Sequence, residues 1–334
     1  MKRKRVTLED VAQIAGVSHM TVSRVVNNRE GVSAETRRQV HEAINELGYR
    51  PSRIARSLVM DKTFTIGLLV PDITNPFFAE VVRGIEDVAW QSDYHVLLAN
   101  SNENPARERV MFGQMEEAAV DGVVICSSRL PDDELFALIK RQRAATVINR
   151  YAPPELASAV LIDPESGNRN VRAAHHLLRT GRKHIGYLYL QRSAISSVIE
   201  DFTQVMEQEG AAINPSWYRG SKPTWEAGYE AATALLTEHP ELDAIVGGND
   251  LVALAALRVA LELGRCVPDD LALTGGDDIL MAREVRPALT TFRSPKYEVG
   301  AAAARLLLAQ LAGNMQYEHV YYREEFIVRE SAPN

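Results

Sequence analysis

Residues 6–27 read VTLEDVAQIAGVSHMTVSRVVN, and Ala12, Gly16 and Val22 within this stretch stand at the spacing of a helix-turn-helix. Two short helices that cross closely need a small residue at the crossing, which Ala12 supplies. The turn needs a residue that tolerates a positive φ, as Gly16 does, and Val22 can close the small core from the second helix. The stretch therefore predicts a helix-turn-helix, although the spacing alone also fits a small helical bundle of no special purpose.

Capping residues delimit three short helices between residues 6 and 50. Thr7 is followed three residues later by Asp10, where a capping box would have Glu. Ser18 can cap the second helix, which runs through Val26. Ser33 opens the third helix and Gly48 ends it. The apolar residues of the first and third helices should each form one stripe: Val11, Ile14 and Ala15, and Val40, Ile44 and Leu47.

Charge is divided unevenly along the chain. The 334 residues carry a net charge of −7, which by itself argues against a nucleic-acid partner. Residues 1–60, however, hold 11 Lys and Arg against 6 Asp and Glu, a net charge of +5, and residues 61–334 carry −12. A basic head on an acidic body predicts that only the head meets a polyanion.

Beyond residue 63, apolar runs alternate with amphipathic stretches of helical length. The expected strands are 65–70, 95–99, 122–126, 146–148, 160–162, 184–188, 244–247 and 271–274, with terminal strands within 319–328. The expected helices include 78–91, 165–178, 199–209, 251–263 and 296–312. This alternation is typical of parallel sheets wound by helices. About 270 residues is long for one such sheet, so two lobes are expected.

The N-terminus does not resemble a targeting signal. Lys2 to Arg5 are followed by Glu9 and Asp10 and not by an apolar run, and no uncharged stretch approaches the ~18 residues that span a bilayer. The two cysteines, Cys126 and Cys266, lie far apart and fit a reducing compartment. We therefore expect a cytoplasmic protein with no membrane partner.

A dense set of matches points to one family. The matching residues are 6–12, 15–18, 21–27, 32–33, 36–37 and 47–49 with Pro51. They resemble the LacI/GalR family of bacterial transcription regulators. The resemblance implies an all-α helix-turn-helix head, a hinge helix, and an α/β core of two Rossmann-like parallel lobes similar to a periplasmic sugar-binding protein. The implied limits are 1–50 for the head, 51–62 for the hinge helix and linker, and 63–334 for the core. Lobe 1 would take 63–161 and 294–320, and lobe 2 would take 162–293 and 321–334.

In such a head, the N-terminal part of the second helix enters the major groove of operator DNA. The resemblance implies that His19 and Met20 hold the positions that choose the operator. Imidazole can pair with a purine edge, and methionine can meet a thymine methyl. Arg24 can reach guanine or a phosphate. The alternatives are that His19 is only solvated and that Met20 only packs. Short polar side chains suited to phosphate contacts are Thr7, Ser18, Thr21, Ser23, Asn27, Ser33 and Thr36.

Residues 52–58, SRIARSL, resemble the hinge helix of the family, with Ser52 where Asn is usual. The resemblance implies that Leu58 wedges into a minor-groove base step, that Ala55 allows close approach, and that Arg53 contacts DNA. Two hinge helices meet at a dyad, so a homodimer and a near-palindromic operator are implied. No leucine heptad tail is evident, which favours a dimer over a tetramer.

Ligands of two-lobed receptors bind between the lobes, at the carboxyl ends of strands. The candidates at such positions are Asn75, Phe77, Phe78, Asn149, Arg150, Asp163, Asn249 and Asp277. Asn249 and Asp277 match the family positions that hydrogen-bond ligand hydroxyls. Phe78 alternatively starts a helix core, and helix capping is the alternative for the polar residues, above all Asp250 and Asp278. The expected effector is a carbohydrate or a derivative.

The pocket departs from the family pattern. Val198 stands where arginine is usual, and Gly276 stands where an aromatic residue is common. Arg192 can compensate for the missing arginine, and Trp225 can form a stacking wall. We expect an atypical effector or weak binding, so neutral pentoses and hexoses should stabilise the protein little.

Two other classes of function fit the sequence less well. No nucleotide-binding, nucleophile-elbow or paired-cysteine motif is present in the sequence, and His175, His176 and His184 lack a metal-like spacing with carboxylates. We therefore expect no enzyme, no catalytic residue, no metal and no cofactor. A sugar-binding transport receptor would fit the core alone, but neither the helix-turn-helix nor the N-terminus fits it.

Overall fold

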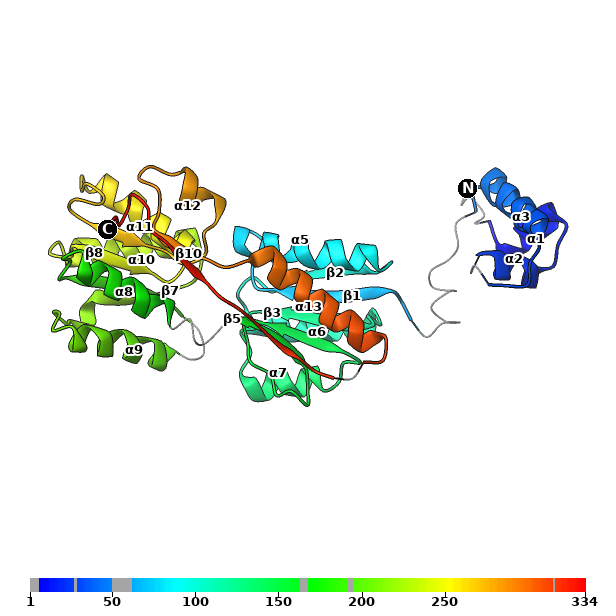
Figure 1. The fold of residues 1–334 in the computed structure, drawn as a ribbon, viewed down its shortest axis with the longest axis horizontal. Coiled ribbons are helices and arrows are strands. Elements are labelled where there is room, and N and C mark those ends of the chain that lie inside the picture. Colours follow the sequence, from blue (N-terminus) through cyan, green and yellow to red (C-terminus); the bar gives the residue numbers. More distant parts are fainter. Residues whose placement is uncertain (1–5, 27–28, 50–61, 163–167, 192–194, 315) are drawn as a thin grey trace. The chain divides into compact units, whose positions relative to one another are not determined.

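A computed structural model describes residues 6–26, 29–49, 62–162, 168–191, 195–314 and 316–334, with side chains in the fifth range from residue 199 onward. The chain forms two compact units, Met1–Phe64 and Thr65–Asn334 (Figure 1). The first unit is called the head and the second the core.

The head contains the three expected helices, α1 (Leu8–Ala15), α2 (His19–Val26) and α3 (Ala34–Leu47). Thr7 and Asp10 form a reciprocal capping box, and Ser33 caps α3. Gly48 ends α3 with a φ of +61°, a conformation that glycine adopts without a steric penalty. The predicted caps are confirmed.

The head buries a small apolar core, formed by Val11, Ala12, Val22, Val25, Val40, Ala43 and Tyr49. Ile44 and Leu47 pack against it, as the stripe on α3 predicts. Ile14 is 52% exposed, so its assignment to the buried stripe of α1 was wrong. The inward face of α1 is centred on Val11 and Ala12, which leaves Ile14 on the solvent side.

The core begins with lobe 1, a six-stranded parallel sheet with the order β11-β5-β4-β3-β1-β2. Its strands are β1 (Thr65–Val70), β2 (His95–Asn100), β3 (Gly122–Cys126), β4 (Ala145–Ile148), β5 (Ser158–Ile162) and β11 (His319–Tyr322). The helices of this lobe are α5 (Pro76–Gln91), α6 (Pro105–Glu117), α7 (Asp132–Ile139) and α13 (Lys296–Leu311).

Helices α5 and α13 pack along each other because two glycines let their backbones approach. A Cβ atom added at Gly84 would lie 2.1 Å from the Tyr297 carbonyl oxygen, and one at Gly300 would lie 2.1 Å from that of Val81. Helices α6 and α7 share a separate apolar cluster with β1, β3, β4 and β5. Helix α5 near the start of the core and helix α13 near its end are thereby joined in one lobe (Figure 1).

Lobe 2 contains a four-stranded parallel sheet with the order β7-β6-β8-β9. Its strands are β6 (Ile185–Leu190), β7 (Tyr218–Ser221), β8 (Ala244–Gly247) and β9 (Ala272–Thr274). Its helices are α8 (Arg169–Arg179), α9 (Ile195–Gln208), the 3-10 helix η2 (Pro215–Trp217), α10 (Trp225–Glu238), α11 (Asp250–Glu262) and α12 (Leu280–Glu284). One apolar cluster joins α8 and α9 to the sheet, and another joins α10 and α11 to it. Lobe 2 therefore has helices on both faces of its sheet.

The chain passes between the lobes more than once. It leaves lobe 1 after β5, returns after β10 (Thr291–Arg293), and crosses again between β11 and β12 (Glu325–Ile327). Strands β10 and β12 pair antiparallel (Figure 1). The predicted fold class, a helical head on a two-lobed α/β core, is confirmed. Among the described helices, none is long and apolar enough to cross a membrane.

Candidate functional site

The turn between α1 and α2 has the geometry that its sequence predicts. Gly16 adopts a φ of +64°, and the Val17 amide donates to the Ala12 carbonyl at 3.1 Å. The Ser18 hydroxyl accepts a hydrogen bond from the Thr21 amide at 3.1 Å, which fixes the first turn of α2. Local bonds and a tolerated positive φ thus hold the two helices of the motif.

The N-terminal end of α2 presents exposed side chains. Ser18, His19, Met20 and Arg24 are exposed, and Met20 is 65% exposed, so it does not pack in the head. A recognition helix contacts base edges in the major groove through exposed side chains near its N-terminus. The exposed side chains of α2 meet this requirement. For His19, a base contact and a solvated side chain both fit this exposure.

Several hydroxyl groups predicted to meet phosphates already serve as helix caps. The Thr7 hydroxyl donates to the Asp10 carboxylate at 2.8 Å, and the Ser33 hydroxyl accepts from the Thr36 amide at 3.1 Å. Thr21, Ser23 and Thr36 are half-buried. The caps lie at helix N-termini, where backbone amides also favour phosphate. Four predicted DNA contacts lie outside the described residues: Asn27, Arg53, Ala55 and Leu58.

A pocket of about 340 Å³ lies between the lobes. Its wall includes six of the predicted ligand residues: Asn75, Phe77, Phe78, Asn149, Asn249 and Asp277. These residues follow β1, β4, β8 and β9, so the carboxyl ends of the strands converge on the pocket as predicted. Asp163 and Arg192 lie outside the described residues.

Helix caps position two of the pocket amides. The Asn75 side chain accepts from the Phe77 amide at 3.0 Å and starts α5. The Asn249 side chain accepts from the Val252 amide at 2.9 Å and starts α11. Capping and lining the pocket are therefore compatible for these residues, because capping engages the amide oxygen. Asn149 has a φ of +56° and donates to the Ser127 hydroxyl at 3.3 Å.

The two phenylalanines have different surroundings. Phe78 is 5% exposed, so it belongs to the buried core as well as to the pocket wall. Phe77 is half-buried and packs against the apolar cluster of α10 and α11 in lobe 2, although it belongs to lobe 1. Their rings meet edge to face, with centroids 5.1 Å apart. The pair thus presents aromatic surface where the two lobes face each other.

Two predicted ligand residues are placed elsewhere. Arg150 donates to the carbonyls of Ser128 and Leu130 at 2.8 and 3.0 Å and pairs with Asp132, so it ties a loop of lobe 1 together. Trp225 is the first residue of α10 and lines a separate apolar groove of lobe 2 beside α11 and α12. Neither residue is part of the pocket wall in the described structure.

Sequence reasoning missed three charged residues of the pocket: Arg129, Arg169 and Glu324. Arg169 donates to the carbonyls of Gly276 and Gly248 at 2.6 and 3.2 Å. A Cβ atom at Gly276 would lie 3.3 Å from its guanidinium carbon. The space that opens because Gly276 has no side chain is therefore occupied by Arg169. Arg169 is the first residue of α8, and its place beside Gly276 follows from the fold and not from a local pattern, because the two residues are far apart in the sequence.

Acidic groups surround Arg169. Its guanidinium lies 3.6 Å from the Asp277 carboxylate and 3.7 Å from that of Glu324. Burial alone would lower the pKa of Arg169, but the two carboxylates outweigh burial and raise it. The arginine therefore stays charged inside the pocket.

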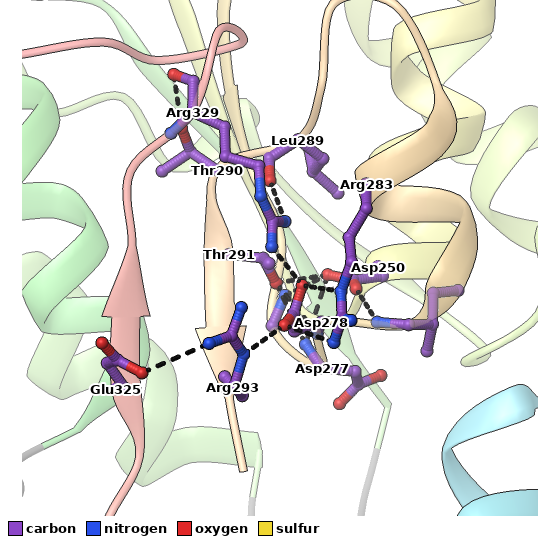
Figure 2. Close-up of polar contacts among 12 residues, drawn as sticks. Asp250, Asp277, Asp278, Arg283, Leu289, Thr290, Thr291, Arg293, Glu325 and Arg329 are labelled. Atoms are coloured by element: carbon purple, nitrogen blue, oxygen red, sulfur yellow. Dashed lines mark hydrogen bonds and ion pairs between the residues drawn. The ribbon is translucent and has the colours of Figure 1, made fainter.

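Beneath the pocket, Asp278 binds three arginines (Figure 2). Its buried carboxylate accepts from Arg283 at 2.9 Å, from Arg293 at 2.6 Å and from Arg329 at 2.5 Å. Burial by itself would raise the pKa of Asp278, but these hydrogen bonds hold it well below its ordinary value. The three arginines come from α12, from β10 and from the segment after β12, so one carboxylate joins three parts of the core.

Asp250 supports the same loop from α11 (Figure 2). Its carboxylate accepts from the amides of Gly276 and Ile279 at 2.8 Å and from the Thr291 hydroxyl at 2.5 Å. Burial raises the pKa of this carboxyl. The alternative of a structural role thus fits Asp250 and Asp278, whereas Asp277 faces the pocket.

Lys296 connects this loop to lobe 1. It is the first residue of α13 and is buried, and its ammonium donates to the carbonyls of Asp277 and Asp278 at 2.8 and 3.2 Å. The same ammonium lies 3.6 Å from the Glu80 carboxylate on α5. A displacement of Asp277 would therefore also move or break the hydrogen bond to Lys296 at the start of α13.

Comparison with known proteins gives the same division of the chain. Residues 7–52 match the model of bacterial regulatory proteins of the lacI family, and residues 174–332 match a periplasmic binding protein-like domain. The HTH-type transcriptional repressor PurR of Haemophilus influenzae (strain PittEE) is 33% identical over 331 residues, which cover 97% of this chain and 98% of the relative.

Solved structures agree with this relationship. A complex of the transcriptional regulator CelR with cellobiose is 30% identical, with a TM-score of 0.70, and the match covers 98% of this chain and all of the other. A lac repressor dimer bound to operator and an anti-inducer has a TM-score of 0.84 at 23% identity, covering 99% of this chain and 100% of the other, and shows the fold alone.

The fold and the two sites define a DNA-binding transcription regulator with a helix-turn-helix head and a two-lobed core. The chain belongs to the lacI family of bacterial regulatory proteins. The resemblance drawn from its sequence is confirmed.

Proposed function

We propose that this regulator is a repressor that binds a near-palindromic operator as a homodimer and responds to a small effector in the interlobe pocket. The observation that carries the proposal is the coexistence of two recognition surfaces in one chain. These are the exposed N-terminal turn of α2 and the interlobe pocket of about 340 Å³. Related proteins support both the repressor role and the small effector, since one relative is named a transcriptional repressor and another is solved in complex with cellobiose.

The proposed domains are those that the sequence suggests: a head at 1–50, a hinge and linker at 51–62, and a core at 63–334. Within the core, lobe 1 takes 63–161 and 294–320, and lobe 2 takes 162–293 and 321–334. The division of the chain into the compact units Met1–Phe64 and Thr65–Asn334 supports the boundary between linker and core. The proposed DNA contacts centre on His19, Met20 and Arg24, with Leu58 at the hinge. The protein would act in the bacterial cytoplasm, where its DNA is, and not as an enzyme.

A homodimer would cover apolar surface that lobe 2 leaves exposed. The groove beside Trp225 is lined mainly by apolar side chains of α10, α11 and α12, among them Leu251, Leu254 and Met281. Exposed apolar patches are frequent sites of contact between proteins. The occupant proposed here is a second copy of this chain, in keeping with the dimeric lac repressor of the same fold.

Effector control would act through the loop that carries Asp277. A ligand that binds one arrangement of the lobes better than another shifts the population by its differential affinity. Because Lys296 joins this loop to α13 and Glu80, a change at the pocket reaches lobe 1. The proposal is that this change alters whether the hinge segments order on DNA.

Removal of residues 1–60 tests the function. A regulator should lose operator binding in a gel shift while the core still unfolds cooperatively, whereas a transport receptor would lose nothing.

Leu58→Ala in the full chain should weaken operator binding with no change in core stability. Unchanged operator affinity would refute the hinge assignment.

A further inference from the structure

A second pocket, of about 520 Å³, lies along α8 in lobe 2, and we call it the α8 pocket. Four side chains of α8 line it: Arg172, His175, His176 and Arg179. They stand at positions i, i+3, i+4 and i+7, which lie on one face of a helix. Phe326 of β12 and Asn334 also line it, so the pocket lies between α8 and the C-terminal segment. It shares no described residue with the interlobe pocket.

Arg172 is held in place mainly by an aromatic contact. Its guanidinium carbon lies 4.9 Å from the centroid of the Phe292 ring, which in turn packs on the Phe326 ring at 4.7 Å. A guanidinium that stacks on a ring keeps its N–H groups free at the edge of its plane. Within the described residues, its side chain makes one hydrogen bond, a long one of 3.4 Å to the Glu324 carbonyl. Most of its five N–H donors therefore remain for a ligand.

Arg179 is a second cation on the same wall. It stands in the last turn of α8, about 15 Å along the axis from the start of the helix. Its side chain is exposed and forms neither an ion pair nor a hydrogen bond with the described residues. None of the described residues that line the α8 pocket is acidic, and Glu209, which lies 3.1 Å from His175 Nδ1, is not among them. Neither guanidinium therefore has a carboxylate partner on the described wall.

Stabilisation of α8 itself explains only part of this row of basic side chains. Cations in the last turn of a helix complement its dipole, and this accounts for His176 and Arg179. Arg172 is only the fourth residue of α8, near the positive end of the dipole, where a cation is unfavourable. The dipole therefore does not account for the presence of two arginines on one pocket.

Two guanidinium groups fit a phosphate group better than a carboxylate. A phosphate ester carries close to two negative charges and has three strong acceptor oxygens. Arginine binds such a group through two parallel N–H bonds, so one phosphate can engage two arginines. A carboxylate has a single charge and is matched by one arginine. The pair Arg172 and Arg179 therefore favours a phosphate group.

The size and the aromatic side of the α8 pocket favour more than a free ion. A volume of about 520 Å³ is within the range of pockets for small organic ligands. The rings of His176 and Phe326 meet edge to face with centroids 5.0 Å apart. A hydrogen bond of 2.8 Å between His176 Nε2 and the Ala332 carbonyl fixes this side of the pocket. The organic part of a phosphate ester can pack there.

We propose that the α8 pocket is a second ligand site of this protein and binds the phosphate group of a small metabolite through Arg172 and Arg179. The Asn334 side chain can add an amide donor at the same pocket. The site is separate from the interlobe pocket and does not rest on the proposed repressor function.

Matched anions test the chemistry of the site on the intact protein. Inorganic phosphate, phenyl phosphate and benzoate are titrated calorimetrically at one ionic strength set with sodium chloride. Both phosphates should bind, and benzoate, which offers one charge on the same ring, should bind at least about tenfold more weakly. Tighter binding of phenyl phosphate supports an ester as the natural ligand, and tighter binding of inorganic phosphate supports the free ion. The proposal is overturned if neither phosphate binds, or if benzoate binds as tightly.

Substitutions then test the place of binding. Arg179→Gln should weaken phosphate binding at least about tenfold and leave the fold intact, because this side chain has no bond to lose among the described residues. Arg172→Gln should weaken binding as much, with the thermal transition of the core measured beside it. Arg305→Gln is the matched control, since Arg305 is also an exposed helical arginine with no ion pair among the described residues. Unchanged affinity in both Arg179→Gln and Arg172→Gln, or an equal loss in the control, would contradict the proposal.

Discussion

The N-terminal end of α2, which we propose reads DNA, and the interlobe pocket, which we propose binds the effector, are built differently. On α2, His19, Met20 and Arg24 are exposed and follow one another on a single short helix. The pocket draws its residues from several loops of two lobes, and many of them are buried and hydrogen-bonded. The first surface depends on local spacing and the second on the whole topology of the core.

This difference explains what each surface can tolerate. The side chains on α2 can change with little cost to folding, because the core of the head lies on the opposite face at Val22 and Val25. The charged groups under the pocket cannot be changed without a cost to folding. Asp278 alone accepts hydrogen bonds from three arginines that come from separate segments. Specificity for DNA and stability are thus separable in the head, whereas ligand recognition and stability are coupled in the core.

The largest effect is expected from Val22→Asp, which places a carboxylate in the buried core of the head. A small core rarely supplies more than about 3–5 kcal/mol, and burying an unpaired charge costs several. The head should unfold and lose at least about a thousandfold in operator affinity, which is equivalent to ~4 kcal/mol. Gel shift and calorimetry together check this, and the thermal transition of the core should not move.

The control for this substitution is Val110→Asp on α6, where the valine is 61% exposed. It should affect neither operator binding nor stability. Retained operator binding by Val22→Asp would show that the head does not carry DNA recognition.

Asp278→Asn should destabilise the core by about 3–5 kcal/mol, since it leaves three partly buried arginines without their shared carboxylate. Because the folded-state pKa of Asp278 is depressed, its stabilising contribution is complete above the unfolded value of about 3.9 and is lost as the pH falls toward the folded-state pKa. Urea unfolding should therefore show a constant gap between wild type and variant from about pH 5 to 8, and a shrinking gap below about pH 4.

Asp132→Asn is the matched control, because Asp132 is 67% exposed and binds only at the surface of lobe 1. It should cost less than about 1 kcal/mol. A gap for Asp278→Asn that stays unchanged down to pH 3 would contradict the assigned role of this carboxylate.

His19→Ala should relax discrimination at one operator base pair by about 1–3 kcal/mol while leaving the head folded. His41 is also exposed, on α3, so His41→Ala controls for the loss of an imidazole. Affinities for a set of single-base operator variants measure the effect. If the two substitutions change specificity equally, the solvated interpretation of His19 is correct and the reading role is wrong.

The smallest change in the free energy of unfolding is expected at two glycines, Gly16 and Gly113, where an added Cβ would meet no neighbour. Gly16→Ala should destabilise the head by about 1–2 kcal/mol, because the residue adopts a φ of +64°. Gly113→Ala in the middle of α6 should stabilise the core by about 0.5–1 kcal/mol, because an added Cβ meets no neighbour. Destabilisation of the same size at both positions, measured by denaturant unfolding, would remove the backbone argument for the turn.

Local patterns predicted the head and most of the sheet strands. Thr7, Ser18, Ser33 and Gly48 marked the helix ends correctly, since caps depend on residues three or four apart. The strand β7 was missed, because Tyr218–Ser221 contains glycine, arginine and serine and is not an apolar run. The helices α6, α7, α10 and α12 were not named, although Asn104 with Pro105 before α6 and the acidic first turn of α7 are helix-start signals.

The pocket was predicted less completely for a physical reason. Residues at strand ends, such as Asn75 and Asn249, could be found because parallel strands bring those ends together. Glu324 could not, because its place depends on how the chain crosses between lobes near the C-terminus. Trp225 was misplaced because its position at the start of α10 directs it to the groove beside α11 and α12.

A genome-wide footprint of the intact protein, made in parallel with the Val22→Asp variant, tests the central claim most directly. The account predicts a small set of protected sites that share one near-palindromic sequence, all of them lost in the variant. Protection without a shared sequence, or the same sites protected by the variant, would contradict the claim that the head reads operator DNA.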